Sequence, residues 1–487
     1  MLLLFRWFIR HFHCTVSVQI DYGRIVLVGY NRPYMNLSSL SLSDQRDLVK
    51  SKEIDASDLA LICYRQIERL NSILNAFITV ISPEPSTSQS GSLSGIPVAV
   101  KDLYDTKGIR TTGGSLFFTN NIPQEDSYVI QKVKRAGAQI VGKTNTHEIA
   151  LGVTNNNPHF GACKNPWDIT RTPGGSSGGS AVAVATGMAM AALGTDTGGS
   201  IRIPASLCGV VGLKPTYGRV SLRGILPLSW NLDHAGPLTR NVEDAALMLQ
   251  VMGGYDELDP TSVKTLPGDY SSHLRDTMKD RKVALAVGNF IEEADPEVLE
   301  AVHQAAQVLV AQGSIIIEEN VDFLREGALA NALMTQADGA AFHRDRLKEH
   351  PDWFGADVRQ RLETGAAFTS TEYALARRIQ VEVRRKCEVL LNSYDMLILP
   401  TTPIPAPVLE GEDAVERARQ LTRFTAPFNL TGLPALSVPC GFTKDGLPIG
   451  LQIVSRAWNE AGVLRTGYAY QEATNWHKRK SLFANHD

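Results

Sequence analysis

The chain alternates short apolar runs with longer stretches whose apolar residues recur at helical spacing. Runs such as 96–100 and 282–287 predict buried strands, whereas 55–76 and 296–312 predict helices. Further strands are predicted over 138–141, 314–317, 396–399, 435–438 and 450–454, and further helices over 181–193 and 460–472. This alternation indicates an α/β fold: a single large domain with a mixed, mostly parallel central sheet that helices cover on both faces.

The pattern also divides the chain. Residues 35–487 are expected to form one domain, with a core at about 95–254. The segment at about 325–393 is helix-rich and more charged, which suits a variable region beside that core.

The first 34 residues form an N-terminal extension of uncertain role. Arg6 and Arg10 interrupt its apolar run, and no small-residue cleavage site follows, which argues against a secretory signal. Because no acidic residue precedes Asp21, the composition also fits an organellar presequence. We favour the simpler alternative that the functional chain begins near Met35.

Composition narrows the class of protein. A net charge of −3 on 487 residues gives no long-range attraction to nucleic acid or to an anionic membrane. No apolar run reaches the length of about 18 residues that a membrane-spanning helix needs. The six cysteines form no CxxC pair and no zinc-type cluster, so we expect free thiols, a reducing compartment and a cytoplasmic location. These features favour an enzyme acting on small molecules, without nucleic-acid or membrane partners.

Lys101 follows the apolar run 96–100. A lysine at a strand end is usually a solvated charge, but the carboxyl end of a buried strand is where α/β proteins place their sites. To act as a base, its pKa must fall from ~10.4 to ~7–8. Burial can lower a lysine pKa by about 3–5 units, so this role is physically attainable.

Ser176 lies in the glycine- and serine-rich stretch 174–180. Such a stretch is often a linker, but here it lies between Trp167 and the apolar run 181–193, so a linker is not expected. It has neither the GK[ST] ending of a P-loop nor the spacing of a dinucleotide fingerprint. Its glycines allow close backbone approach, and Ser176 could relay a proton.

Ser200 ends the motif Thr197-Gly198-Gly199-Ser200. Consecutive N–H groups around two glycines can point at one spot, as an oxyanion hole requires. Alone, the motif is better explained as a tight turn capping the next helix, and only the combination with Lys101 and Ser176 favours a catalytic role.

Together the three features predict a serine hydrolase activated by lysine, with no metal and no organic cofactor. Histidine is the rival base, but no G-x-S-x-G nucleophile elbow accompanies His147, His159 or His234. We therefore expect structural roles for these histidines.

These stretches resemble the amidase signature family of serine hydrolases. The similarity includes 174–181 and 194–205, the 24-residue step from Ser176 to Ser200, the strand that ends at Lys101, and the segments 400–403 and 432–439. It extends over about residues 36 to 475. The resemblance implies the α/β fold that the alternation of strands and helices also predicts. It further implies an amidase that hydrolyses linear amides, with anilides, esters and carbamates as further substrates.

The resemblance also implies roles for the residues. Ser200 would be the nucleophile, Ser176 the bridging serine with a cis peptide bond to Gly175, and Lys101 the base. The N–H groups of Thr197, Gly198, Gly199 and Ser200 would hold the oxyanion. Asp196 and Arg202 would brace the loop rather than react.

The choice within the family depends on the sequence around Phe424. The alternative function is that of the glutamine-hydrolysing component of a tRNA-dependent amidotransferase, in which an acidic residue precedes the corresponding phenylalanine-threonine pair. Here Thr422 and Arg423 occupy that place, so glutamine's ammonium would lack a partner. A free-standing amidase is therefore favoured, although Arg384 could meet a substrate carboxylate and the existence of a partner chain stays open.

A scaffold without activity is the third alternative, and the three occupied catalytic positions argue against it. We expect the acyl pocket to be lined by 151–158 and by the variable region at 325–393. The identity of the amide, and whether the protein forms a homodimer, are not encoded in any motif.

Overall fold

The computed structural model describes residues 17–21, 24–28, 40–82, 91–265, 268–410 and 414–484. The chain divides into two compact units near residue 40. In the first unit, strand β1 (Ser17–Asp21) pairs antiparallel with β2 (Arg24–Val28). The other expectations for residues 1–34 lie outside the described residues.

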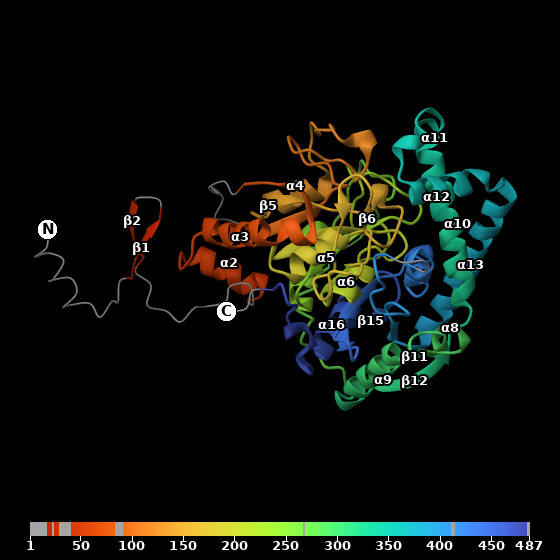
Figure 1. The fold of residues 1–487 in the computed structure, drawn as a ribbon. Helices are drawn as coiled ribbons and strands as arrows, with labels where there is room; N and C mark the ends of the chain where they lie inside the picture. The colour runs from red at the N-terminus through yellow and green to blue at the C-terminus, as the bar shows by residue number, and fades with distance from the viewer. Residues whose placement is uncertain are drawn as a thin grey trace, which may run out of the picture. The chain divides into compact units, whose positions relative to one another are not determined.

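The second unit is built on one eleven-stranded sheet in the order β12-β11-β13-β15-β14-β9-β10-β8-β4-β5-β3 (Figure 1). Its strands are β3 (Phe77–Val80), β4 (Pro97–Lys101), β5 (Gln139–Thr144), β8 (Ala191–Asp196), β9 (Val211–Lys214), β10 (His234–Thr239), β11 (Lys282–Val287), β12 (Ile315–Asn320), β13 (Met396–Pro400), β14 (Ala435–Phe442) and β15 (Pro448–Val454). A separate short ribbon joins β6 (Asn156–Asn157) to β7 (Gly161–Ala162).

The sheet is mixed, as predicted, with four parallel and six antiparallel strand pairs among the described residues. Parallel pairing occurs in two blocks, β12-β11-β13 and β8-β4-β5. Antiparallel pairs join these blocks through β15, β14, β9 and β10. The strands are not parallel across the centre of the sheet. Only residues 443–447 connect β14 to β15, and so short a connection can join only antiparallel strands.

Helices surround this sheet (Figure 1). They are α2 (Leu42–Lys50), α3 (Ala56–Leu74), α4 (Tyr128–Arg135), α5 (Gly178–Ala185), α6 (Arg202–Cys208), α7 (Val242–Met252), α8 (Asn289–Glu292), α9 (Pro296–Ala311), α10 (Leu324–Phe342), α11 (Arg344–Glu349), α12 (Ala356–Ala367), α13 (Ser370–Ser393), α14 (Ala414–Arg419), α15 (Ala426–Leu430) and α16 (Glu460–Glu472). Within the described residues, no helix is both long and apolar enough to cross a bilayer.

The burial of the central strands shows that both faces of the sheet are covered. Every residue of β4, β8 and β10 is buried. Because successive side chains of a strand point to opposite faces, complete burial requires a layer on each side. The expected α/β architecture is therefore confirmed.

The helix expected over 181–193 is wrong in its second half. Helix α5 ends at Ala185, Gly187 has a φ of 74°, and Ala191 begins strand β8. A run of alanines carries no clear 2- or 3.6-residue period, so the pattern could not separate the end of a buried helix from the start of a buried strand.

The sheet brings two site-bearing strands to one edge. Strands β4 and β8 are parallel neighbours, with Val98 opposite Ala191 and Val100 opposite Leu193. Their carboxyl ends therefore meet, and this is the usual place for a site in an α/β sheet.

Candidate active site

Lys101 ends β4 and is completely buried. Its Nζ donates hydrogen bonds to Ser176 Oγ at 2.7 Å and to Thr195 Oγ1 at 2.8 Å. Thr195 comes from the neighbouring strand β8, so the parallel pair places both residues at one sheet edge. Two of the three catalytic positions expected from the sequence are thus in direct contact.

Burial is the main influence on the pKa of the Lys101 amine. It lowers the pKa of the amine to about 7, against a smaller opposing effect of Asp196 and Asp233. A lysine that acts as a base near neutral pH needs a pKa of this size.

The Ser176 loop is fixed to the sheet by hydroxyl groups. The peptide bond between Gly175 and Ser176 is cis, as the family resemblance implied. Ser177 Oγ donates to Thr195 O at 3.1 Å, and Ser180 Oγ donates to Leu193 O at 2.9 Å. The serines around Ser176 therefore hold the loop against β8.

Ser200 lies in the turn between β8 and α6 and is 5% exposed. The N–H of Ser177 donates to Ser200 O at 3.2 Å, so the two serine loops are adjacent. The structure describes all of residues 176–200, and there the hydroxyls of Ser176 and Ser200 share no hydrogen bond. A proton relay from Ser200 through Ser176 to Lys101 would need this bond to form. Such bonds are often loose without substrate and tighten when it binds.

The peptide groups before Ser200 have a defined direction. Asn331 Nδ2, from α10, donates to Thr197 O at 3.1 Å, and Thr425 Oγ1 donates to Gly198 O at 2.6 Å. In a trans peptide unit the C=O of one residue and the N–H of the next point in opposite directions. The N–H groups of Gly198 and Gly199 therefore point away from Asn331 and Thr425, and they donate to no group of the described chain.

Glycine is required at position 199. Its φ is 136°, and a Cβ placed there would lie 2.2 Å from Thr425 Oγ1 and 2.6 Å from Ile203 Cδ1. The hydrogen bond of Thr425 to this turn is thus possible only because residue 199 has no side chain.

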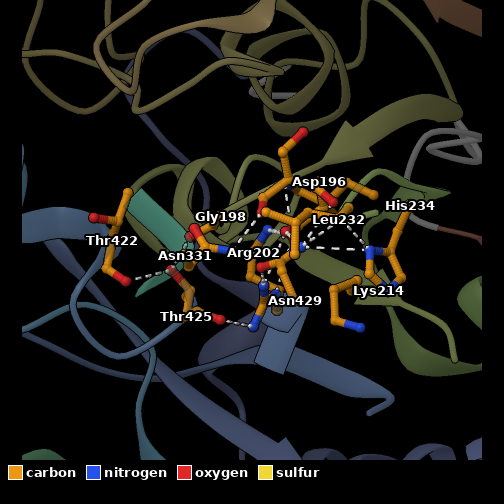
Figure 2. A network of polar contacts seen from close by, with 12 residues as sticks. Asp196, Gly198, Arg202, Lys214, Leu232, His234, Asn331, Thr422, Thr425 and Asn429 are labelled. Atoms are coloured by element: carbon orange, nitrogen blue, oxygen red, sulfur yellow. Dashed lines mark hydrogen bonds and ion pairs between the residues drawn. The ribbon is translucent and has the colours of Figure 1, made fainter. Parts of the chain in front are cut away.

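A buried ion pair between Asp196 and Arg202 joins the two ends of the turn that carries Ser200. Arg202 Nη2 lies 2.8 Å from Asp196 Oδ1, and Arg202 Nε lies 3.0 Å from Asp196 Oδ2. Asn429 Nδ2 donates to Asp196 O at 2.7 Å, and its Oδ1 accepts from Arg202 at 2.7 Å (Figure 2). Burial acts to raise the pKa of Asp196, but the Arg202 guanidinium holds it well below its usual value. This contact set fits the bracing role expected for Asp196 and Arg202.

The three histidines of the core have other partners. His147 Nε2 lies 2.9 Å from Asp357 Oδ2, and His159 Nε2 lies 3.1 Å from Glu148 Oε1. His234 Nδ1 lies 2.7 Å from Leu232 O. Their ring nitrogens thus bind acids and a carbonyl rather than a serine hydroxyl. In the described part of the chain, no group of three or more His, Cys, Asp or Glu side chains is placed to hold a metal ion.

Sequence reasoning missed four polar residues at this site, namely Thr195, Asn331, Thr425 and Asn429. Thr195 stands inside the stretch 194–205 that carries the family resemblance, and Thr425 and Asn429 closely follow Thr422 and Arg423. Hydroxyl and amide side chains in these segments are therefore a signal for them. Asn331 belongs to the variable region and carries no local signal, since its partner Thr197 is 134 positions away.

A buried lysine bonded to a serine, next to a glycine-rich turn with a second serine, is the arrangement that the sequence predicts for a serine hydrolase activated by lysine. The chain belongs to the amidase family, whose model matches residues 58–464, and it is therefore a hydrolase of carbon–nitrogen bonds. It is 37% identical over 486 residues to the glutamyl-tRNA(Gln) amidotransferase A subunit of Geobacter sp. (strain M21), covering 92% of this chain and 100% of that protein.

Solved structures show the same fold. The glutamyl-tRNA(Gln) amidotransferase A subunit of Thermotoga maritima superposes with a TM-score of 0.81 at 34% identity, covering 90% of this chain and 95% of that one. The 6-aminohexanoate cyclic dimer hydrolase, complexed with its substrate, gives a TM-score of 0.84 at 28% identity, with 93% and 100% coverage.

Proposed function

We propose that the protein hydrolyses a carboxylic amide to an acid and an amine or ammonia through an acyl-enzyme on Ser200. The hydrogen bond from the buried Lys101 amine to Ser176 is the observation that supports this proposal most strongly. A lysine whose pKa is lowered to about 7 is neutral in a large share of molecules at physiological pH, so it can accept a proton.

The reaction has two steps. Ser200 Oγ attacks the amide carbonyl while its proton passes through Ser176 to Lys101. The proton then passes to the nitrogen of the leaving amine as the carbon–nitrogen bond breaks, and water hydrolyses the ester left on Ser200. Because the intermediate is an ester of serine, amides, anilides, esters and carbamates can all form it, provided that they fit the site.

The oxyanion that forms in each step would be bound by the N–H groups of residues 197–200. The directions of the Gly198 and Gly199 N–H groups, set through the carbonyls that Asn331 and Thr425 hold, support this role. One oxyanion donor contributes about 2.7–4 kcal/mol to transition-state binding.

Loss of either carbonyl contact should therefore lower kcat more than it changes KM. We expect Asn331→Ala and Thr425→Val each to lower kcat about 10- to 100-fold, below the full effect of ~10²–10³ for a lost donor, because the N–H group is misdirected rather than removed. Steady-state kinetics on one amide measures this, with the exposed Glu326→Ala on the same helix α10 as the control. A loss confined to KM would contradict the role.

A second candidate function is hydrolysis of glutamine within a tRNA-dependent amidotransferase, which the names of the relatives favour. The geometry argues against it. Thr422 lies beside Gly198, with its Cγ2 3.9 Å from where a Cβ of that glycine would stand. Arg423 instead pairs with Glu293 and covers the ring of Phe290. Glutamine's ammonium would thus meet a threonine rather than a carboxylate, and a buried unpaired ammonium is costly.

Arg384, which could have met a substrate carboxylate, is exposed on α13, and no hydrogen bond or ion pair within the described residues directs it toward the Ser200 turn. We therefore propose an amidase that acts without a tRNA-loading partner. A cytoplasmic location fits the five buried free cysteines among the described residues, whereas Cys14 lies outside them.

The deciding assay measures ammonia release from simple primary amides and from glutamine, with and without glutamyl-tRNA and candidate partner proteins. The proposal predicts turnover of simple amides by the protein alone, and at most weak release from glutamine. Glutamine turnover that requires a partner protein would favour the second candidate. If no substrate is turned over and a fluorophosphonate does not label Ser200, the chain is an inactive scaffold.

A further inference from the structure

A cavity of about 240 Å³ opens beside the proposed catalytic groups. Thr195 and Thr197 form part of its wall, and the Thr195 hydroxyl also accepts the hydrogen bond from Lys101. The remaining wall comes mainly from two loops, residues 222–230 and 258–261. A group bound in this cavity would therefore lie next to the amide that Ser200 attacks.

Neither 151–158 nor 325–393, the segments expected to line the acyl pocket, contributes a residue to the lining of this cavity. Leu151, Val358 and Leu362 are all buried and join one hydrophobic cluster with Leu103 and Leu228. These three residues therefore pack against residues of the cavity wall without lining the cavity themselves.

The walls of the cavity are largely apolar. Hydrocarbon side chains that line it include Leu222, Ile225, Leu226, Pro227, Leu228 and Pro260. At the protein surface Trp230 and Leu258 also line it, and they are 48% and 68% exposed. Two large exposed apolar residues beside an apolar cavity are a feature typical of a binding site.

The three charged side chains of the lining already have partners. Asp233 accepts from Thr197 Oγ1 at 2.5 Å and from the N–H groups of Leu228 and Ser229 at 2.8 and 3.1 Å. Asp259 accepts from the N–H of Leu222 at 2.7 Å, and from the N–H and hydroxyl of Thr261 at 2.8 and 2.7 Å.

Arg223, the third charged group, lies 2.8 Å from Asp256, and its guanidinium lies over the ring of Tyr128. Its charge is therefore already matched. The carboxylates of Asp233 and Asp259 would in addition repel an anionic ligand. An ammonium group would lose its hydrating water and find only carboxylates that already accept three hydrogen bonds each, so its binding is also disfavoured.

We propose that this cavity binds an uncharged, apolar acyl group of about the size of a benzene ring, so that the substrates are amides of neutral aryl or branched alkyl acids. An apolar cavity of about 150 Å³ is large enough for benzene, so the space here suffices for a ring with a short linker. The acyl group suits an enclosed cavity because it stays on Ser200 through both steps, whereas the amine must leave after the first. This inference rests on the proposed amidase function.

The test compares kcat/KM for phenylacetamide, acetamide, and phenylacetamide carrying a para-carboxylate or a para-aminomethyl group. We expect phenylacetamide to exceed acetamide by on the order of 100-fold, since a single methylene in an apolar pocket is worth about 10- to 200-fold. Both charged analogues should fall at least tenfold below phenylacetamide. Equal turnover of acetamide and phenylacetamide, or faster turnover of either charged analogue, would overturn the proposal.

Variants of the two exposed lining residues, Trp230 and Leu258 (the mouth of the cavity), test whether the preference for phenylacetamide arises in this cavity without disturbing the core. Leu258→Ala and Trp230→Ala should each lower the ratio of kcat/KM for phenylacetamide to that for acetamide by about tenfold. Leu329→Ala removes a side chain that is 69% exposed on α10, outside the cavity, and should leave the ratio unchanged. An unchanged ratio in both mouth variants would refute the assignment of the cavity.

The two proposals fail in different ways. If acetamide is hydrolysed as well as phenylacetamide and a small fluorophosphonate labels Ser200, the amidase function stands and only the substrate class is refuted. If no amide is hydrolysed and Ser200 is not labelled, the proposed function itself is refuted.

Discussion

Replacing Ser200 by alanine should lower kcat/KM for any amide substrate by at least about 10⁴-fold, because loss of the nucleophile in a serine hydrolase costs up to ~10⁶-fold. The variant should still fold. Ser200 is in a turn, and its hydroxyl has no hydrogen-bond partner within the described residues, so the substitution removes little stabilising contact. Hydrolysis rate and far-UV circular dichroism of the purified variant measure both effects.

Ser206→Ala is the matched control. Ser206 lies in the helix that follows Ser200, is also buried, and its hydroxyl has no partner among the described residues. We expect near wild-type activity from it. If Ser200→Ala kept more than a few per cent of the wild-type rate, another residue would have to be the nucleophile.

Replacing Lys101 by methionine should reduce activity nearly as much. Methionine keeps much of the side-chain volume but cannot accept the proton that leaves Ser200. Wild-type activity should rise with pH through about 7, the pKa of the buried Lys101 amine, and should then level off. Lys101→Arg is the charged control, since arginine stays protonated and should also be inactive at every pH tested.

The same substitution should change the pH dependence of stability. The pKa of Lys101 is about 7 in the folded chain, below its ordinary value of 10.5, so between these values the unfolded chain binds more protons. The free energy of unfolding of the wild type therefore gains a contribution from Lys101 that grows as pH rises from 7 toward 10.5. Lys101→Met removes this contribution. The free energy of unfolding of the variant minus that of the wild type should therefore be larger at pH 7 than at pH 9.5.

Denaturant unfolding at the two pH values checks this expectation. Ser176→Ala offers a useful comparison, because it removes a hydrogen-bond partner of Lys101 but leaves the buried amine in place. A wild-type minus Lys101→Met difference that does not change with pH would show that the amine is not buried as the structure has it.

Much of this site could be predicted from the sequence because its signals are local. The apolar run before Lys101 indicates a buried strand, and the strand end then fixes where the amine lies. The glycines around Ser176 and Ser200 mark turns that only small residues permit, as the contact between Gly199 and Thr425 shows. The mixed α/β sheet followed from the same alternation of apolar runs and helical spacing.

The rest could not be predicted, since it depends on contacts between distant segments. The carbonyl of Thr197 is held by Asn331 across 134 positions, and the carbonyl of Gly198 by Thr425 across 227. The residues that line the cavity next to Thr195 could not be predicted for a related reason. Residues 222–230 and 258–261 have no motif, and only the folded chain shows that they face Thr195 and Thr197.

The most direct test of the lysine-activated serine is the rate at which a fluorophosphonate labels Ser200 at different pH values, followed by intact-mass spectrometry. This rate reports activation of the hydroxyl without any dependence on substrate choice. We expect the labelling rate of the wild type to rise through an apparent pKa of about 7, and labelling of Lys101→Met to be nearly abolished. Labelling of Lys101→Met at the wild-type rate, or a wild-type rate that does not vary between pH 5.5 and 9, would contradict it.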